Sequence, residues 1–276
     1  MTFNISLINR TLSFTLGTML VCSLTASPTM ALEKDQAKEV LDRIYQTTIH
    51  SYYSVNSFYN FSANQADQKQ LSSINESVDT INQNIEILET SLADGATTET
   101  FSSVQDSWDR YSNVLSENID VVVDTGYPDL RLAGDMATTN IALTDALDGL
   151  YNNVISVTNT QPEKIVTLSR DASRNIALMM TKYSARSTST VSQVYTGGDT
   201  EITIDSLARE FEKQLDELIS LTADNANASE LLDAAKTKWD FIRSSYINYN
   251  ENRVNFIVNL YSKKIIDDIQ GMASNY

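Results

Sequence analysis

The sequence predicts an all-α protein built from two tandem antiparallel helical bundles in an elongated arrangement. Three observations support this prediction. The 276 residues include only 3 Pro and 8 Gly, which are too few turn residues for an all-β protein. Apolar residues recur at steps of three and four, as they do on one face of a helix. The second half of the chain also repeats features of the first half at a nearly constant spacing.

Residues 1–31 have the features of a secretory signal peptide. Arg10 precedes an apolar segment at residues 11–24, which is too short to span a membrane, and Thr29 and Ala31 are small residues at the −3 and −1 positions of a cut after Ala31. We therefore expect cleavage near Ala31 and a periplasmic or secreted product that does not insert into a membrane. An uncleaved anchor helix is the alternative. The only cysteine, Cys22, lies in this segment, so we expect no disulfide or thiol chemistry after cleavage.

The first predicted bundle covers residues 32–162. It begins with a long helix, and polar breaks at 64–67, 93–96 and 125–128 separate three further helices. We expect the fourth, at about 129–158, to be a connector helix that continues through Gln161 and Pro162 into the second bundle. The apolar stripes of the second, third and fourth helices are Ile74, Val78, Ile81, Ile85, Leu88 and Leu92; Phe101, Val104, Trp108, Tyr111 and Leu115; and Leu143, Leu147, Leu150 and Val154.

The second predicted bundle, residues 163–276, is interpreted as a duplicate of the first. The chain has two tryptophans, and the residues around them have the same apolar spacing. We expect Trp108 and Trp239 to anchor the two cores rather than to stack on a ligand. The matched pairs are Tyr53-Ser54 with Tyr183-Ser184, Ala93-Asp94 with Ala223-Asp224 and, after one inserted residue, Trp108-Asp109 with Trp239-Asp240.

The end of the second copy is expected to differ from the end of the first. Its third helix is predicted to run without interruption from about residue 229 to 270, because that segment contains no Gly or Pro. This prediction leaves no room for a fourth helix. The apolar face of the second copy would then be covered by the connector helix or by another chain, and the sequence does not decide between them.

This architecture resembles the helical sensor domain of type IV pilus chemotaxis transducers (PilJ-type), which is related to nitrate and nitrite sensor domains. The resemblance is best in residues 172–180, where the family has Ala-Gly-Arg followed by further arginines. Here Ala172 and Arg174 match, Ser173 replaces the glycine, and the later arginines are missing. The corresponding residues 42–50 of the first copy have lost the motif. The resemblance implies a periplasmic sensor that binds a small ligand and acts through a partner.

The candidate ligand-binding residues are the cations of a short basic stretch in an acidic chain, whose formal charge is −16. Arg170 and Arg174 are four residues apart on one helix face, and so are Lys182 and Arg186. The first two could bind a small anion or carboxylate through their guanidinium groups. The alternative is that these cations only offset the acidic helices beside them.

The sequence gives no support for a metal, a cofactor or catalysis. His50 is the only histidine, so a metal site would lack His and Cys partners, and we expect it to lie on a helix face among aromatic residues. Met179 and Met180 are interpreted as core residues rather than as haem ligands. No nucleophile, phosphate-binding or zinc-protease motif is present. An acidic chain is also a poor binder of nucleic acid.

We therefore expect a non-enzymatic periplasmic sensor or ligand-binding accessory protein. Its partner would be another envelope protein or a second copy of the chain. The alternative is a structural or interaction protein of the cell envelope that binds no small ligand. In that case an exposed apolar face would serve as a docking surface.

Overall fold

The computed structural model describes residues 34–64, 66–93, 95–188, 202–248 and 254–276. These residues are helical apart from their turns and contain no strand, which confirms the all-α prediction. The expected signal peptide at residues 1–31, with Cys22, lies outside the described residues. The helices are α1 (Lys34–Ala63), α2 (Gln68–Ser91), α3 (Thr98–Thr125), α4 (Leu130–Thr158), α5 (Lys164–Thr188), α6 (Ile204–Leu221), α7 (Ala226–Ile247) and α8 (Asn255–Ala273).

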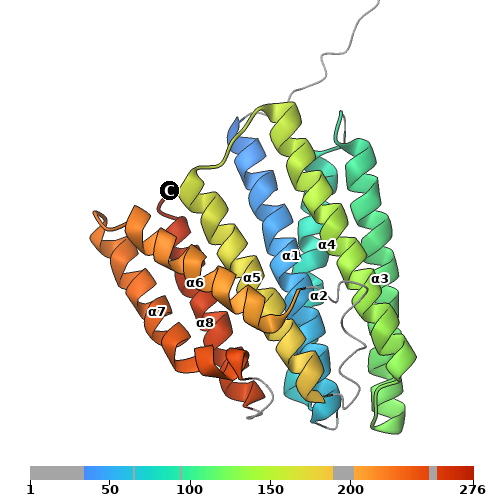
Figure 1. The fold of residues 1–276 in the computed structure, drawn as a ribbon. Helices are drawn as coiled ribbons and strands as arrows, with labels where there is room; N and C mark the ends of the chain where they lie inside the picture. Colours follow the sequence, from blue (N-terminus) through green and yellow to red (C-terminus); the bar gives the residue numbers. More distant parts are fainter. Residues whose placement is uncertain (1–33, 65, 94, 189–201, 249–253) are drawn as a thin grey trace, which may run out of the picture.

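The helices form two groups, the first helical group α1–α4 and the second helical group α5–α8. The same pairs are in contact in both groups: the first helix with the second, the third with the fourth, and the first with the fourth. Helices α1 and α5 lie side by side in the middle, with the remaining helices of each group on opposite sides (Figure 1). This arrangement differs from the elongated one expected for two bundles joined by a continuous helix.

The predicted apolar stripes form the interior of each group. The stripe of α2 faces the first core, where Ile74, Ile81 and Leu88 are fully buried. At the corresponding spacing in α6, Ile204 is 6 % exposed, and Phe211 and Leu218 are fully buried in the second core. Heptad-like spacing therefore predicted which side of each helix is removed from water.

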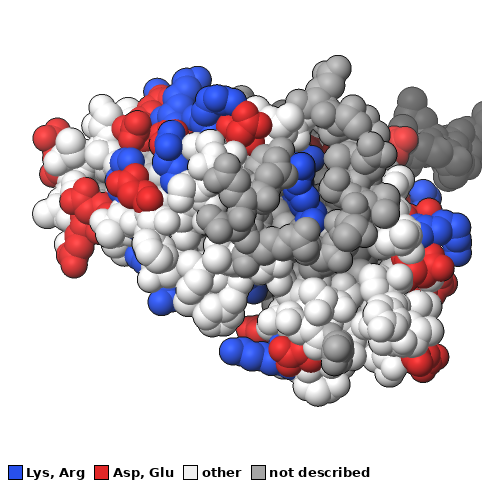
Figure 2. Space-filling view, turned by 60° about the horizontal axis from the view of Figure 1, so that its bottom comes forward, with Lys and Arg blue, Asp and Glu red and all other residues white. Residues whose placement is uncertain are grey.

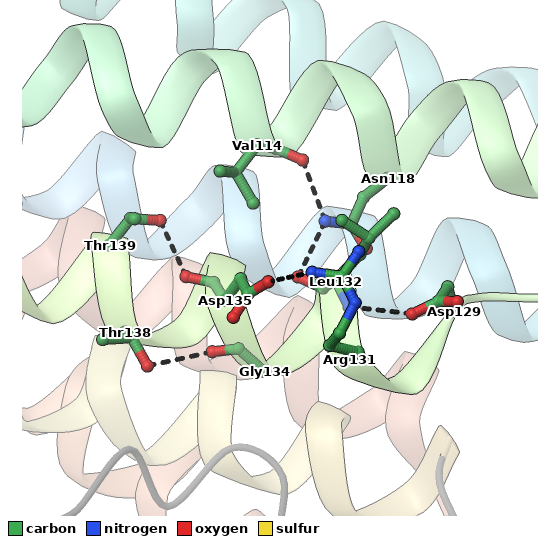
Figure 3. Close-up of polar contacts among 9 residues, drawn as sticks. All are labelled: Val114, Asn118, Asp129, Arg131, Leu132, Gly134, Asp135, Thr138 and Thr139. Carbon is green, nitrogen blue, oxygen red and sulfur yellow. Dashed lines mark hydrogen bonds and ion pairs between the residues drawn. The ribbon is translucent and has the colours of Figure 1, made fainter.

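Local sequence sets where α4 begins (Figure 3). The carboxylate of Asp129 accepts a hydrogen bond from the backbone N–H of Leu132 at 2.9 Å and so caps the helix. The buried Asn118 of α3 donates to the carbonyls of Val114 at 2.8 Å and Leu132 at 3.0 Å. This amide joins α3 to the first turn of α4, and it holds the two helices together at the end where their connecting turn lies.

The predicted helix across Gln161 and Pro162 is wrong. Helix α4 ends at Thr158, and Asn159 follows in the left-handed conformation with φ of 50°. Helix α5 begins only at Lys164. Pro162 has no backbone N–H and disfavours a helical residue before it, so the chain turns back here and α5 packs against α1.

The predicted uninterrupted helix at residues 229–270 is also wrong. Helix α7 ends at Ile247 and α8 begins at Asn255. The sequence between them carries Asn248, Asn250 and Asn252, and asparagine is a poor residue for the interior of a helix. The second group therefore has a fourth helix. Helix α8 covers the apolar face for which the connector helix or another chain was considered.

Candidate functional site

The basic stretch lies on α5 and makes ion pairs with three different helices. Lys164 pairs with Glu217 of α6 at 2.7 Å, Arg170 with Asp42 of α1 at 3.2 Å, and Arg174 with Asp148 of α4 at 2.6 Å. Two of these pairs connect the second helical group to the first. The cations of α5 thus offset acidic neighbours, as one of the two interpretations of the sequence expects, and Arg170 and Arg174 do so where the two helical groups meet.

Arg170 is the most enclosed of these three cations, with a side chain only 14 % exposed. Its Nη1 donates to the hydroxyl of Tyr151 at 3.0 Å and its Nη2 to Asp42 at 3.2 Å. The guanidinium also lies 5.4 Å from the ring centroid of Tyr45 and 5.8 Å from that of Tyr151. These contacts fix its position and use two of the five N–H groups that a guanidinium carries.

A cavity of about 510 Å³ opens beside Arg170, where α1, the start of α5 and the end of α8 meet. Its volume is within the range of small-molecule sites in proteins. One wall comes from the first helical group and the others from the second, so an occupant would contact both. The lining residues are Lys38, Leu41, Asp42, Tyr45 and Gln46; Gln161, Pro162 and Glu163; Val166, Ser169 and Arg170; and Gln270, Ala273, Ser274 and Tyr276.

The floor of this cavity is held by a buried tyrosine. Tyr45 is 5 % exposed, and its hydroxyl accepts a hydrogen bond from Nε2 of Gln270 at 3.0 Å. Burial raises the pKa of Tyr45 to about 12, so the phenol keeps its proton at neutral pH. The contact ties α1 to α8 directly below the cavity.

Arg174 lies one turn further along α5 and lines a smaller cavity of about 50 Å³, which Arg170 also lines. This volume accommodates no more than a few water molecules. Burial disfavours the charge of Arg174, but the hydrogen bond and the charge of Asp148 outweigh it, and the pKa of Arg174 is raised. Burial likewise raises the pKa of the nearby Asp171 carboxyl. The structure therefore places Arg170 and Arg174 side by side, but only Arg170 reaches the larger cavity.

Lys182 and Arg186 lie in the last turns of α5. The step from Arg170 to Lys182 spans about 18 Å along the helix. Both side chains are partly exposed, and neither lines the cavity. The four cations proposed from the sequence thus do not form one site.

The other residues singled out in the sequence lie in the buried cores or beside them. Trp108 is 6 % exposed in the first core, and Trp239 and Met179 are fully buried in the second. Met180 is also fully buried. His50 packs edge-on against Tyr53, with ring centroids 5.6 Å apart. Burial lowers the pKa of His50, and the charge of Lys263 lowers it further. Among the described residues no group of three or more His, Cys, Asp or Glu could hold a metal ion.

The contacts between α1 and the second helical group, which we call the central junction, were not predicted. Asn56 of α1 donates to Met180 O at 3.2 Å, to Ser184 Oγ at 2.8 Å and to Asn259 Oδ1 at 3.0 Å. Thr181 donates to the carbonyl of Tyr52 at 3.2 Å. These polar residues follow no period along the chain. The contacts that α8 makes with α1 were not predicted either, because residues 229–270 were assigned to one helix.

The surface shows the same pairing of charges as the junction. On the face drawn in Figure 2, most blue basic side chains lie next to red acidic ones. Pairs along a single helix, such as Arg131 with Asp135 at 2.9 Å, are well exposed and contribute little to stability. Arg170 therefore differs from the arginines of such exposed pairs, because its side chain is largely removed from solvent.

Comparison with known proteins gives no match, whether by family, by curated sequence or by solved structure. Within the part of the chain that the structure describes, no helix is both long and apolar enough to cross a lipid bilayer. The candidate site therefore has to be interpreted from its own geometry.

Proposed function

We propose that the protein is a non-enzymatic binding protein of the sensor type, which takes a small ligand with a carboxylate or other anionic group into the cavity beside Arg170. The observation that carries this proposal is the position of that arginine. It is 14 % exposed, lies 5.4 Å and 5.8 Å from two tyrosine ring centroids, and lines a cavity of about 510 Å³ between the two helical groups. A positioned guanidinium is a strong and directional partner for a carboxylate.

The position of the cavity suggests how binding would be transmitted. Its walls come from α1, α5 and α8, so an occupant would favour one placement of these helices over another. Small shifts between packed helices are a common response to ligands, and a partner protein could detect such a shift. This mode of action agrees with the resemblance to PilJ-type sensor domains. We also propose that the two groups arose by duplication. The same helices are paired in both groups, and each core contains one tryptophan, which supports this proposal.

The binding proposal is tested by thermal unfolding and calorimetric titration with acetate, succinate, citrate, nitrate and phosphate. A ligand present at 100 times its dissociation constant raises the free energy of unfolding by about 2.7 kcal/mol. We expect this stabilisation in the unaltered protein and in Arg131→Gln, whose arginine is 74 % exposed and lies outside the cavity lining. It should be weaker in Arg170→Gln. Equal binding by Arg170→Gln contradicts the proposal, and so does the absence of binding by every carboxylate or oxyanion, including carboxylates that also carry a positive group.

The proposed location is a periplasmic or secreted one, reached through cleavage near Ala31. Expression of the full chain in a bacterium, followed by N-terminal sequencing of the extracellular or periplasmic fraction, tests it. The expected first residue is Leu32 or a close neighbour. Retention of residues 1–31 on the product would favour an anchor helix instead.

A second candidate is an interaction protein that binds no small ligand. Exposed aromatic residues on α7 and α8 favour it: Phe241 is 62 % and Phe256 is 69 % exposed. Phe241 packs against Tyr261 of α8 at 5.1 Å between centroids. A stable dimer by light scattering that dissociates in Phe241→Ser, together with no ligand effect on unfolding, supports this candidate over the first.

A further inference from the structure

The cavity beside Arg170 carries as many negative as positive side chains, which bears on the kind of ligand it takes. Lys38 and Arg170 line it, and so do Asp42 and Glu163. A simple anion would gain from the two cations but would be repelled by the two carboxylates. It would also fill only a small part of about 510 Å³. The charges and the size of the cavity therefore favour a larger ligand that carries both signs.

Arg170 and Asp42, which both line the cavity, form a pair of opposite charges. Nη2 of Arg170 contacts Oδ1 of Asp42 at 3.2 Å, and the Asp42 side chain remains 55 % exposed. Its other carboxylate oxygen has no partner among the described residues, and neither has Nε of Arg170. Arg170 thus offers hydrogen-bond donors to a carboxylate. Asp42, a few ångströms away, offers an acceptor to an ammonium group.

The remaining lining supplies an acceptor and an apolar wall. Nε2 of Gln270 is engaged with Tyr45, which leaves its side-chain carbonyl as a further acceptor among the lining residues. Leu41, Pro162 and Val166 contribute apolar surface to the same cavity. An aliphatic or aromatic side chain of the ligand would be removed from water against them.

We infer that the cavity binds a zwitterion of the amino-acid class, a free amino acid or short peptide with an apolar side chain, its carboxylate on Arg170 and its ammonium group on Asp42. This inference rests on the proposed function, since it names the ligand of the same site. It differs from that proposal by requiring a positive group on the ligand.

The test compares L-leucine and glycyl-L-leucine with analogues that lack one pole. The analogues of leucine are N-acetyl-L-leucine and 4-methylpentanoate, which have no ammonium group, and L-leucinamide, which has no carboxylate. Calorimetric titration of the purified protein should show binding of leucine or the dipeptide, and a loss of about tenfold or more in affinity for every analogue. The same protein is titrated with acetate and succinate as simple carboxylates.

Two variants assign the poles. Asp42→Asn should weaken binding of the zwitterion about tenfold and should not weaken binding of 4-methylpentanoate, because it removes a carboxylate that repels the carboxylate of that ligand. Arg170→Gln should weaken both. Arg131→Gln serves as the control and should bind as the unaltered protein does. Thermal unfolding and circular dichroism without ligand verify that each variant is folded.

The outcomes separate this inference from the proposed function. If 4-methylpentanoate binds as tightly as leucine, or if Asp42→Asn binds leucine normally, the zwitterion is excluded while a carboxylate site at Arg170 stands. If the simple carboxylates bind and neither leucine nor the dipeptide does, the zwitterion is again excluded and the carboxylate site at Arg170 again stands. If no compound in either set binds, both the inference and the proposed function fail.

Discussion

The interiors of the two helical groups and the central junction between them differ in how much hydrogen bonding and charge they contain. Each interior is an apolar core, with Trp108 and Tyr111 in the first group and Trp239 and Phe211 in the second. The central junction adds hydrogen bonds and ion pairs, among them those of Asn56 and Arg170, to the apolar contacts that Ile49 and Tyr52 of α1 make with the second core. The cavity lies at the end of this junction, where Leu41 of the first core and Tyr45 of the second line it together with charged side chains.

This difference separates stability from binding. Apolar cores gain stability roughly in proportion to the area they remove from water, and they tolerate no empty space. A polar junction gains less net free energy for each contact, because its groups exchange one set of hydrogen bonds for another. The junction can therefore leave a cavity and charged groups accessible while the two interiors keep the molecule folded.

The largest expected effect comes from truncating a core tryptophan. Trp239 is fully buried and lies 4.8 Å from the ring of Phe211, whereas Trp108 is 6 % exposed at the edge of its core. Trp239→Ala should lower the free energy of unfolding by about 3–5 kcal/mol, and Trp108→Ala by somewhat less. Urea unfolding followed by far-UV circular dichroism measures both.

The exposed Phe241 provides the matched control, and Phe241→Ala should change stability by no more than about 0.5 kcal/mol. If either tryptophan variant is too unstable to purify, the corresponding Trp→Phe change should give the same order with smaller losses. A cost below about 1 kcal/mol for Trp239→Ala would show that this residue does not anchor the second core.

The central junction should respond less strongly. Asn56→Ala removes the donor that Met180, Ser184 and Asn259 share, and leaves these buried or partly buried acceptors without it. We expect a loss of about 1–3 kcal/mol by urea unfolding. Asn75→Ala, on the exposed side of α2, is the control and should be neutral. Equal values for the two variants would mean that the junction contributes nothing measurable.

The junction should also make stability depend on pH. Burial lowers the pKa of His50, which packs near Lys263 of α8 and Glu76 of α2, so the folded protein holds the imidazole neutral. Below about pH 6.5 the unfolded chain gains a proton that the folded chain does not, and stability therefore falls as the pH falls. One such group contributes a slope of at most about 1.4 kcal/mol per pH unit.

Since His50 is the only histidine, His50→Gln removes this contribution completely. The unfolding free energy of the variant, measured between about pH 7 and 5.5, should be flatter than that of the unaltered protein. Parallel curves for the two proteins would show that His50 titrates as it does in water.

The smallest expected difference is between two ion pairs. Arg174 and Asp148 have side chains 32 % and 40 % exposed, against 74 % and 51 % for Arg131 and Asp135. A double-mutant cycle to Ala should give a coupling of about 1 kcal/mol for the first pair and about 0.3–0.5 kcal/mol for the second. A coupling as large for the exposed pair as for the enclosed one would contradict this order.

The cores could be predicted from the sequence because their residues are periodic. The stripe from Ile74 to Leu92 and its counterpart from Ile204 to Leu218 repeat with the helix and need no knowledge of their partners. The end of α7 at Ile247 was missed because residues 229–270, which contain no Gly or Pro, were assigned to one helix. The asparagines at 248, 250 and 252 were a usable signal, as the polar residues at 64–67 were in the first group.

The candidate site was predicted only in part. Arg170 stood out as a cation in an acidic chain, and its distance of four residues from Arg174 placed them on one face. Asp42 and Gln270 could not be joined to it, because they lie 128 residues before and 100 residues after it in the sequence, and no pattern of spacing relates them. Such long-range polar contacts depend on how the two helical groups pack together.

The most direct test of the central claim, that ligands bind at the end of the central junction, is hydrogen–deuterium exchange with and without saturating L-leucine or glycyl-L-leucine. We predict slower exchange in residues 38–46, 161–170 and 270–276, which line the cavity, and no change at the α3–α4 turn around Asp129. Protection confined to other helices, or identical exchange in both states, would contradict the account.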